Sequence, residues 1–422
     1  KKQLQFVKAD MNVTLDLNQN TITAEAGEAI AINAANITLT VKNGTIENFA
    51  EGNYSDGVYA YKESNNLTLT FESVVLKSRT QGLAVQGLTS NSNVNIVNSK
   101  ITSAEELGIY YPPKSGTLTI SDSEITGVTG IVVKGSNLVV KGEKTIISGT
   151  GPNVDPETYY TGATDGSSTL TETGDALYIE SGYNDRDISV SISGGHLNSK
   201  SAKAVRMFVK NGENTSAKRE ISVTGGTFSS DVSAYVAEGY VQNENGTVEQ
   251  LGETNAVAKI DDTYYKTLAD AVAAANDGKT VTLLKNVVLN STLTLNKSMT
   301  LDLNGCKISN GSTMGTDYLV SIAANADVSI VGNKENSKIS DSRSNAQGTI
   351  TAVVVYGKLT VAGDNLTISR GANGIAIKVE DNPGTLIVNG GTITVDKPTK
   401  TSSQAIQNWG NATINSGVFN GD

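Results

Sequence analysis

Several residue types are scarce in this chain of 422 residues, which has one cysteine, one histidine, one tryptophan and six prolines. The single cysteine, Cys306, excludes an internal disulfide framework. The single histidine, His196, leaves little for acid–base catalysis, which uses this side chain more than any other. No apolar run approaches the ~20 residues of a membrane-spanning helix. We therefore expect no membrane insertion.

The composition favours short strands and an acidic surface. Gly, Asn, Ser and Thr are abundant, and this mixture suits many short strands joined by turns. The formal net charge is -10 at pH 7. Because binding to a phosphate backbone requires a basic surface, we expect no nucleic-acid partner.

A short pattern recurs along almost the whole chain. It consists of an apolar strand end, a turn of small or polar residues and another apolar residue, as in VKNGTI (41–46), ISDSEI (120–125) and VNGGTI (388–393). Alternating apolar residues precede each copy, which is typical of a half-buried strand. A second strand, usually entered through Gly or Ala, lies between copies, as in GVYAY (57–61) and GIVVK (130–134). Repeats with a period of roughly 20–50 residues predict stacked coils.

The pattern fits three short strands in each turn of a parallel β-helix. It resembles the right-handed parallel β-helix of the pectate-lyase-like superfamily, which implies an all-β solenoid fold and says little about activity. Within the repeat, His196 occupies a turn position that holds Lys100, Glu124 and Thr227 in other copies. We therefore interpret His196 as a surface position on a coil corner rather than as a catalytic base.

A longer duplication divides the chain. MNVTLDLNQNTIT (11–23) aligns with KSMTLDLNGCKIS (297–309) without a gap. We predict a first β-helix unit at 1–250 with a trimmed N-terminal cap, a linker and capping helix at 251–280, and a second unit at 281–422. The one short helix is expected in TLADAVAAANDG (267–278), with Thr267 as its N-cap. Such a helix would cover the open apolar end of the second stack of coils.

Two stretches carry a more specific resemblance. YYKTLADAVAAANDGKTVTLLKNVVL (264–289) and GGTFSSDVSAYVAEGYV (225–241) look like modules repeated in large surface proteins of gut-dwelling Gram-positive bacteria. Those proteins resemble adhesins, being exported, attached to the cell wall and built of tandem modules. The resemblance implies an extracellular location and a binding or spacer role, and it names no ligand. We expect a monomer within a longer multi-module chain, with a glycan, or a host or bacterial surface protein, as partner.

The strands between repeat copies carry the candidate binding face. If their apolar residues point inward, the next residues point outward and stack in columns. One column contains Tyr59, Tyr110, Tyr178 and Arg206, and a second contains Tyr61, Lys134 and Glu180. Sugars bind with their C–H faces on aromatic rings and with polar groups at the rim, so these columns predict a glycan groove. The alternative is that tyrosine is simply a favourable strand residue at half-exposed positions.

The longest departure from the repeat is the insertion at 149–175. Long insertions in a regular array are often functional, and this one brings Tyr159 and Tyr160 beside the tyrosine face. Its acidic residues and those of the following segment could together coordinate calcium; they are Asp155, Glu157, Asp165, Asp185 and Asp187. No ordered calcium-binding spacing is present, so we predict no cofactor and keep calcium as the alternative.

Catalysis on a polysaccharide is the alternative function, because the same superfamily contains lyases and glycoside hydrolases. The best cluster for it would be Lys134, Glu180, Asp185, Asp187 and Arg206, whose members are scattered. No nucleophile elbow, phosphate-binding loop, dinucleotide fingerprint or zinc-ligand spacing appears. We therefore predict a non-catalytic binding protein, with an enzyme and a pure stalk as alternatives.

Overall fold

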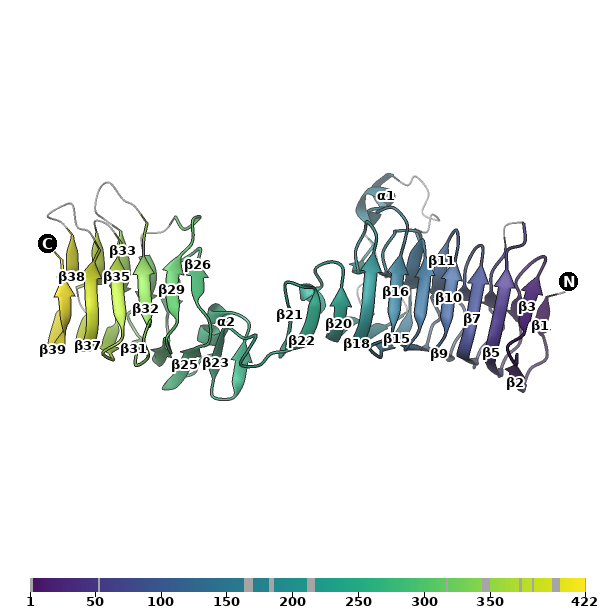
Figure 1. Ribbon diagram of the computed structural model, residues 1–422, viewed down its shortest axis with the longest axis horizontal. Helices are drawn as coiled ribbons and strands as arrows, with labels where there is room; N and C mark the ends of the chain where they lie inside the picture. The colour runs from purple at the N-terminus through teal and green to yellow at the C-terminus, as the bar shows by residue number, and fades with distance from the viewer. Residues whose placement is uncertain are drawn as a thin grey trace. The chain divides into compact units, whose positions relative to one another are not determined.

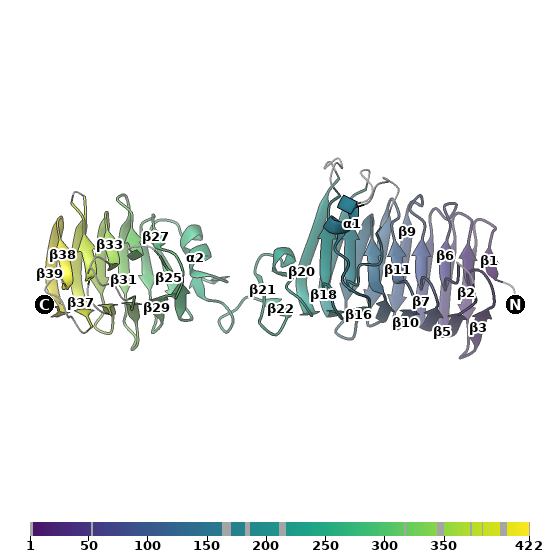
Figure 2. The same ribbon diagram turned by 90° about the horizontal axis from the view of Figure 1, so that it is seen from above.

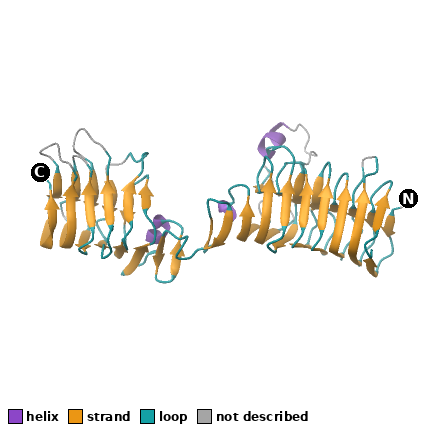
Figure 3. Cartoon of the chain, viewed as in Figure 1, coloured by secondary structure: helices purple, strands orange, loops and turns teal. Residues whose placement is uncertain are grey.

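The computed structural model describes residues 3–51, 54–162, 170–181, 186–210, 217–315, 318–343, 350–371, 374–381, 383–396 and 403–421. The chain divides into two compact units, 1–250 (unit 1) and 251–422 (unit 2). Almost all regular structure in the described residues is β-strand, and most strand pairs are parallel (Figure 1, Figure 3).

The described part of unit 1 contains two sheets, in which most strands pair with the equivalent strand of the next coil, while β22 pairs antiparallel with β20 and β21. Within the described part, sheet A is formed by β1 (Leu4–Phe6), β4 (Ile30–Ile32), β6 (Val58–Ala60), β8 (Leu83–Val85), β11 (Leu107–Tyr111), β14 (Thr129–Val133), β17 (Leu177–Glu180) and β19 (Val205–Phe208). Sheet B is formed by β2 (Asn12–Asp16), β3 (Thr21–Ala24), β5 (Thr38–Asn48), β7 (Thr68–Ser78), β9 (Ser92–Val97), β10 (Lys100–Ser103), β12 (Gly116–Ser121), β13 (Glu124–Gly127), β15 (Ser136–Lys141), β16 (Ile146–Gly149), β18 (Ile188–Ser199), β20 (Arg219–Phe228), β21 (Tyr240–Gln242) and β22 (Thr247–Gln250). One coil is a strand of sheet A followed by one long or two short strands of sheet B.

Unit 2 repeats this arrangement with fewer coils. Its larger sheet, sheet C, is formed by β23 (Ala258–Ile260), β24 (Thr263–Tyr265), β25 (Lys279–Leu283), β26 (Val287–Leu289), β28 (Met299–Asp302), β29 (Lys307–Asn310), β31 (Asp327–Val331), β32 (Lys338–Asp341), β34 (Lys358–Ala362), β35 (Thr367–Arg370), β37 (Thr385–Val395) and β39 (Asn411–Asn420). Sheet D is formed by β27 (Leu293–Leu295), β30 (Tyr318–Ile322), β33 (Thr351–Val355), β36 (Ile375–Val379) and β38 (Gln404–Asn408).

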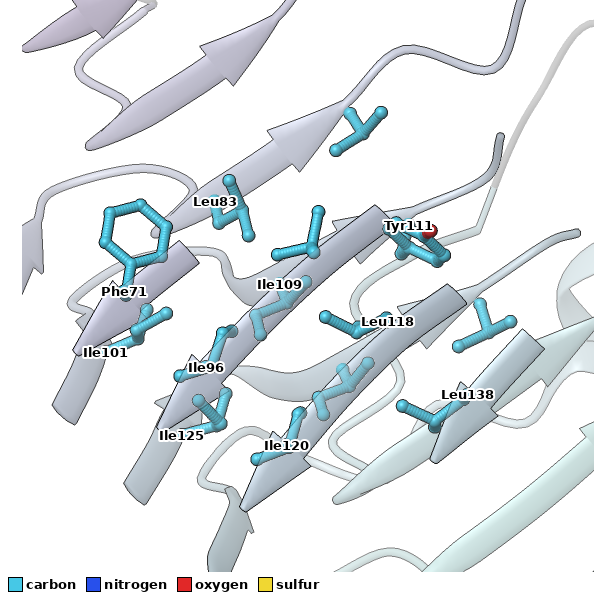
Figure 4. Close-up of a cluster of buried hydrophobic side chains, with 14 of the residues drawn as sticks. Phe71, Leu83, Ile96, Ile101, Ile109, Tyr111, Leu118, Ile120, Ile125 and Leu138 are labelled. Atoms are coloured by element: carbon cyan, nitrogen blue, oxygen red, sulfur yellow. The ribbon is translucent and has the colours of Figure 1, made fainter. Parts of the chain in front are cut away.

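The core of each unit lies inside its coils. In sheet A, Val58 pairs with Leu83 and Leu83 with Ile109, and all three side chains are fully buried. Figure 4 shows Leu83 and Ile109 facing side chains of sheet B such as Phe71 and Ile96. Burying one such side chain contributes about 1.5–3 kcal/mol, so the alternating apolar pattern drives the coiling.

Asparagine side chains link successive coils at one turn of unit 1. The amide of Asn66 donates to Asn36 Oδ1 over 2.8 Å, and the amide of Asn91 donates to Asn66 Oδ1 over 3.1 Å. The backbone φ angle is 59° at Asn36, 55° at Asn66 and 54° at Asn91. All three angles lie in the left-handed region, which asparagine tolerates better than most residues. The abundance of asparagine in the turns therefore has a conformational cause.

The helices agree with the sequence in part. Helix α2 (Leu268–Ala274) begins after Thr267, whose side chain accepts a hydrogen bond from the Asp270 N–H, as the N-cap prediction requires. It contacts β23, β24 and β25, and its Leu268 and Val272 belong to the core of unit 2. The prediction of a single helix was wrong, because the insertion forms α1 (Pro156–Gly162), and a 3-10 turn, η1 (Ser233–Tyr235), follows β20.

His196 is exposed on β18, and the pairing register places it beside Ile146 and Thr227. Thr227 is one of the residues predicted to share its repeat position. In the described residues, no helix has the length and apolar character needed to cross a bilayer.

Candidate functional site

The first outward column of sheet A has the predicted register. Tyr59 pairs with Ala84, Ala84 with Tyr110 and Tyr110 with Val132. Val132 in turn pairs with Tyr178, and Tyr178 with Arg206. The sequence predicts that these side chains face solvent. In the structure, Tyr59 and Tyr110 are partly exposed, whereas Tyr178 and Arg206 are buried.

The insertion covers the part of this column nearest the C-terminal end of unit 1. Figure 2 shows α1 against the outside of unit 1, over the later coils. Beneath it lies a second apolar cluster, separate from the main core, made of Leu107, Val132, Tyr178 and Phe208, with Tyr110 and Tyr160 packed against it. The rings of Tyr160 and Phe208 stack with centroids 5.5 Å apart and planes 5° apart. The insertion therefore covers the predicted face instead of forming a wall beside it.

A buried polar network fixes the insertion in this position. Lys134 Nζ lies 2.8 Å from Glu180 Oε1, and the hydroxyls of Tyr178 and Tyr160 donate to Glu180 Oε2 over 2.7 and 2.8 Å. The Leu170 N–H donates to the Tyr160 hydroxyl, and Lys134 Nζ donates to the Leu170 carbonyl. Burial, followed by the nearby Glu180 carboxylate, raises the pKa of Tyr178, so its hydroxyl remains a donor.

Arg206 is also held by the insertion. Its Nε lies 2.9 Å from Asp175 Oδ2, and Nη1 donates to the Val154 carbonyl over 3.1 Å. Burial raises the pKa of Asp175, although Arg206 acts in the opposite direction. The prediction that Lys134, Tyr178, Glu180 and Arg206 face solvent was therefore wrong, because the residues that pair with them come from the insertion or from the strand it covers.

In the earlier coils of the same face, the tyrosine side chains keep part of their surface exposed. Tyr59 and Tyr61 are both partly exposed, and their ring centroids lie 4.6 Å apart with planes tilted by 55°. We call these two residues the tyrosine pair. The hydroxyl of Tyr61 donates to the buried carboxylate of Glu28, and Tyr54 nearby is exposed. Burial is the largest cause that raises the pKa of both Tyr59 and Tyr61, so both hydroxyls are neutral at physiological pH.

A small hollow lies between α1 and the last strand of sheet A. It has a volume of about 150 Å³ and is lined by Glu157, Tyr160, Thr161, Phe208 and Lys210. Lys210 Nζ lies 4.5 Å from the centroid of the Tyr160 ring, while Tyr159 contacts Tyr160 edge-on at 5.2 Å. Tyr110 lies between this region and the tyrosine pair and is half-buried.

The acidic residues proposed for calcium are not gathered into a metal site within the part of the chain that the structure describes. Asp155 accepts hydrogen bonds from the Glu157 N–H and the Thr158 hydroxyl at the start of α1. Asp187 accepts from the Lys218 N–H. Asp165 and Asp185 lie outside the described residues. Of the proposed catalytic cluster, Lys134 and Glu180 are in contact but buried, and Arg206 pairs with Asp175 instead, while Asp185 lies outside the described residues.

Sequence reasoning missed two carboxylates beside the tyrosine pair. Glu28 and Asp56 stand immediately before the Ala or Gly through which β4 and β6 are entered, and both are buried. Burial raises the pKa of Asp56, with Glu28 adding to the effect. The sequence did contain a signal for these two carboxylates. A polar residue precedes the Ala or Gly at the start of each of these strands, and the next coil has Gln81 at the same position.

Comparisons with known proteins give little further information. A scan against protein-family models finds no match, and a search of curated proteins finds none either. Among solved structures, the chain is similar to the PL6-family alginate lyase AlyGC, with a TM-score of 0.23 and 11% identity over 99% of this chain and 85% of that chain. A variant of the same enzyme gives a TM-score of 0.22 at the same identity and coverage. A likeness at this level carries no inference about activity or substrate.

Proposed function

We propose that this chain belongs to a non-catalytic, adhesin-like surface protein of a bacterium, in which two right-handed parallel β-helices stand in tandem, and that unit 1 binds glycans through the tyrosine pair. The observation that carries glycan binding is the partly exposed contact between Tyr59 and Tyr61 beside the buried Glu28. The extracellular location at the cell wall rests on the resemblance of 225–241 and 264–289 to modules of bacterial surface proteins.

The tyrosine pair has the properties that sugar recognition needs. Two tilted rings offer an angled apolar floor for the C–H face of a sugar, and phenol groups supply hydrogen bonds at its edge. The hydrogen bond from Tyr61 to Glu28 fixes that ring before any ligand arrives, so little side-chain entropy is lost on binding. A host or bacterial surface protein is the other partner that a tyrosine-rich surface would suit.

A polysaccharide-active enzyme is the second candidate, and two carboxyl groups favour it. Burial raises the pKa of both Asp56 and Glu106, and the Asp56 carboxylate contributes to the shift at Glu106. A raised pKa is a property of a general acid. Against this, Asp56 is buried and accepts hydrogen bonds from the Thr80 hydroxyl and the Gln81 N–H, which accounts for it as a structural group. A stalk without a ligand is the third candidate.

The test is a glycan-array screen of the purified chain, with and without calcium, comparing the parent protein with Tyr59→Ala/Tyr61→Ala. We expect binding to a restricted set of glycans and at least a tenfold loss in the double variant. Tyr264→Ala, at a partly exposed tyrosine of unit 2, is the matched control and should bind as the parent does. Binding that survives in the double variant would contradict the site, and release of shortened oligosaccharides would favour the enzyme.

A further inference from the structure

Unit 2 presents a second aromatic surface, made of residues from three neighbouring coils. Tyr356, Glu380 and Trp409 stand directly after β33, β36 and β38, which pair in register through Val355, Val379 and Asn408. The N–H groups of Glu380 and Trp409 donate to the carbonyls of Val355 and Val379 in the preceding coils. The three side chains therefore form one column, with Glu380 between two aromatic residues.

Contacts within this column fix its side chains. Lys378 Nζ lies 2.6 Å from Glu380 Oε1 and 4.2 Å from the centroid of the Trp409 ring. A cation is attracted to the face of an indole ring, so Lys378 holds the ring in position. The hydroxyl of Tyr356 is hydrogen-bonded to that of Tyr318, which is the largest cause that raises the pKa of Tyr356 to about 12. The phenol of Tyr356 is therefore neutral at physiological pH.

Trp409 differs from its neighbours in exposure. The side chains of Lys378 and Glu380 are only 16% and 13% exposed, whereas Trp409 is 59% exposed. Lys378 therefore holds the Trp409 ring while most of its surface stays open to solvent, an arrangement that suits stacking against a ligand. Its indole N–H is also a hydrogen-bond donor.

We propose that Trp409, Glu380 and Tyr356 form a binding site for a neutral oligosaccharide. One sugar ring would stack on Trp409, and the Glu380 carboxylate would accept hydrogen bonds from sugar hydroxyls. Coils repeat at about 4.8 Å, so Tyr356 and Trp409 are about 10 Å apart along the column, the span of two sugar residues in an extended chain. Lys378 is neutralised by Glu380, so the column of Tyr356, Glu380 and Trp409 favours a neutral ligand over a uronate or sulfate group. This site lies in unit 2 and is independent of the tyrosine pair proposed for unit 1.

The chain provides its own reporter for this site, because Trp409 is the only tryptophan. The purified full chain would be titrated with cellotetraose, xylotetraose and chitotetraose while tryptophan fluorescence is followed, and the affinity would be measured in parallel by calorimetry. We expect a saturable fluorescence change with at least one of these neutral probes. In calorimetry, Trp409→Ala should weaken that binding at least tenfold, and Tyr356→Ala should weaken it severalfold.

Two controls separate this proposal from the one for unit 1 and from misfolding. Tyr59→Ala/Tyr61→Ala should leave the fluorescence response unchanged, since those residues lie in unit 1. Trp409→Ala should keep the parent's circular dichroism and melting profile, because the side chain is exposed. The proposal is overturned if no neutral probe changes the fluorescence, if binding persists in Trp409→Ala, or if an oligouronate binds as tightly as the neutral probes.

Discussion

The ammonium group of Lys134 lies 2.8 Å from a carboxylate oxygen of Glu180, and the two side chains are only 1% and 3% exposed. Removing one partner of a buried ion pair leaves an uncompensated charge, at a cost of about 3–5 kcal/mol. We therefore expect Lys134→Ala to lower the unfolding free energy of unit 1 by about this amount and to accelerate hydrogen exchange of the α1 amides. Urea unfolding followed by circular dichroism measures the first effect, and exchange mass spectrometry the second.

A matched control is the exposed pair of Lys77 and Glu47, whose charged atoms lie 2.9 Å apart. Surface pairs contribute about 0–1 kcal/mol because water screens both charges. Lys77→Ala should therefore change the midpoint little, and the transition reported by Trp409 in unit 2 should not move in either variant. Equal losses for Lys77→Ala and Lys134→Ala would contradict the role of burial.

The asparagine turn offers a test of backbone conformation. Asn66 has a φ of 55°, and its side chain makes one hydrogen bond to each neighbouring coil, to Asn36 and from Asn91. Asn66→Ala removes both side-chain bonds. It also places alanine, which has no polar side chain to hydrogen-bond locally, in the left-handed region, and this costs about 1–2 kcal/mol. Asn66→Gly removes the same bonds without that steric cost. Denaturant unfolding should rank Ala below Gly in stability, and the reverse order would show that the backbone angle is unimportant here.

The pH dependence of unit 1 should contain a contribution from Asp56, whose pKa is raised chiefly by burial. The folded state holds the proton more tightly than the unfolded state. The contribution is therefore fully present below the ordinary aspartate value of about 3.9 and is lost as pH rises through the raised pKa. Thr80 and Gln81 both donate to Oδ1, an atom that asparagine retains, so Asp56→Asn should keep these bonds and flatten this part of the profile.

Urea midpoints between pH 2.5 and pH 7.5 measure this effect, and the range extends below the ordinary aspartate value of about 3.9, where the contribution of Asp16 is lost. Asp16→Asn is the opposite control, because a hydrogen bond from the Asn18 N–H is the largest cause that lowers the pKa of Asp16. Any stability from Asp16 is present above its unfolded pKa and is lost as pH falls. A profile that is unchanged in Asp56→Asn would contradict the assignment.

The coil repeat and the column register could be predicted because both are local. Alternation within five residues determines which side of a strand is apolar, so Tyr59, Ala84 and Tyr110 were placed in one column from sequence alone. The cap of α2 was equally local, since Thr267 and Asp270 are three residues apart.

Exposure along the column could not be predicted, because it depends on where the insertion folds back. The helix in that insertion did have a sequence signal. Asp155 is a favourable capping residue, Pro156 a favourable first helical residue, and Glu157 an acidic residue in the first turn. Nothing local indicates that Tyr160 then stacks on Phe208, which lies far along the chain. For that reason we propose the binding site at Tyr59 and Tyr61 in the earlier coils.

The glycine through which a strand of sheet A is entered provides the most demanding packing test. A Cβ on Gly108 would lie 2.5 Å from the Gly130 carbonyl oxygen and 2.7 Å from Ile125 Cγ2. That carbonyl is backbone within the stack of coils and cannot move without displacing the next coil. Gly108→Ala should therefore lower the unfolding free energy of unit 1 by at least about 2 kcal/mol, at the upper part of the range for overpacking. Gly252→Ala, where a Cβ would meet no heavy atom within 4 Å, should be neutral or slightly stabilising. If Gly108→Ala unfolds at the parent's urea midpoint, the coils are not packed as closely as this contact requires.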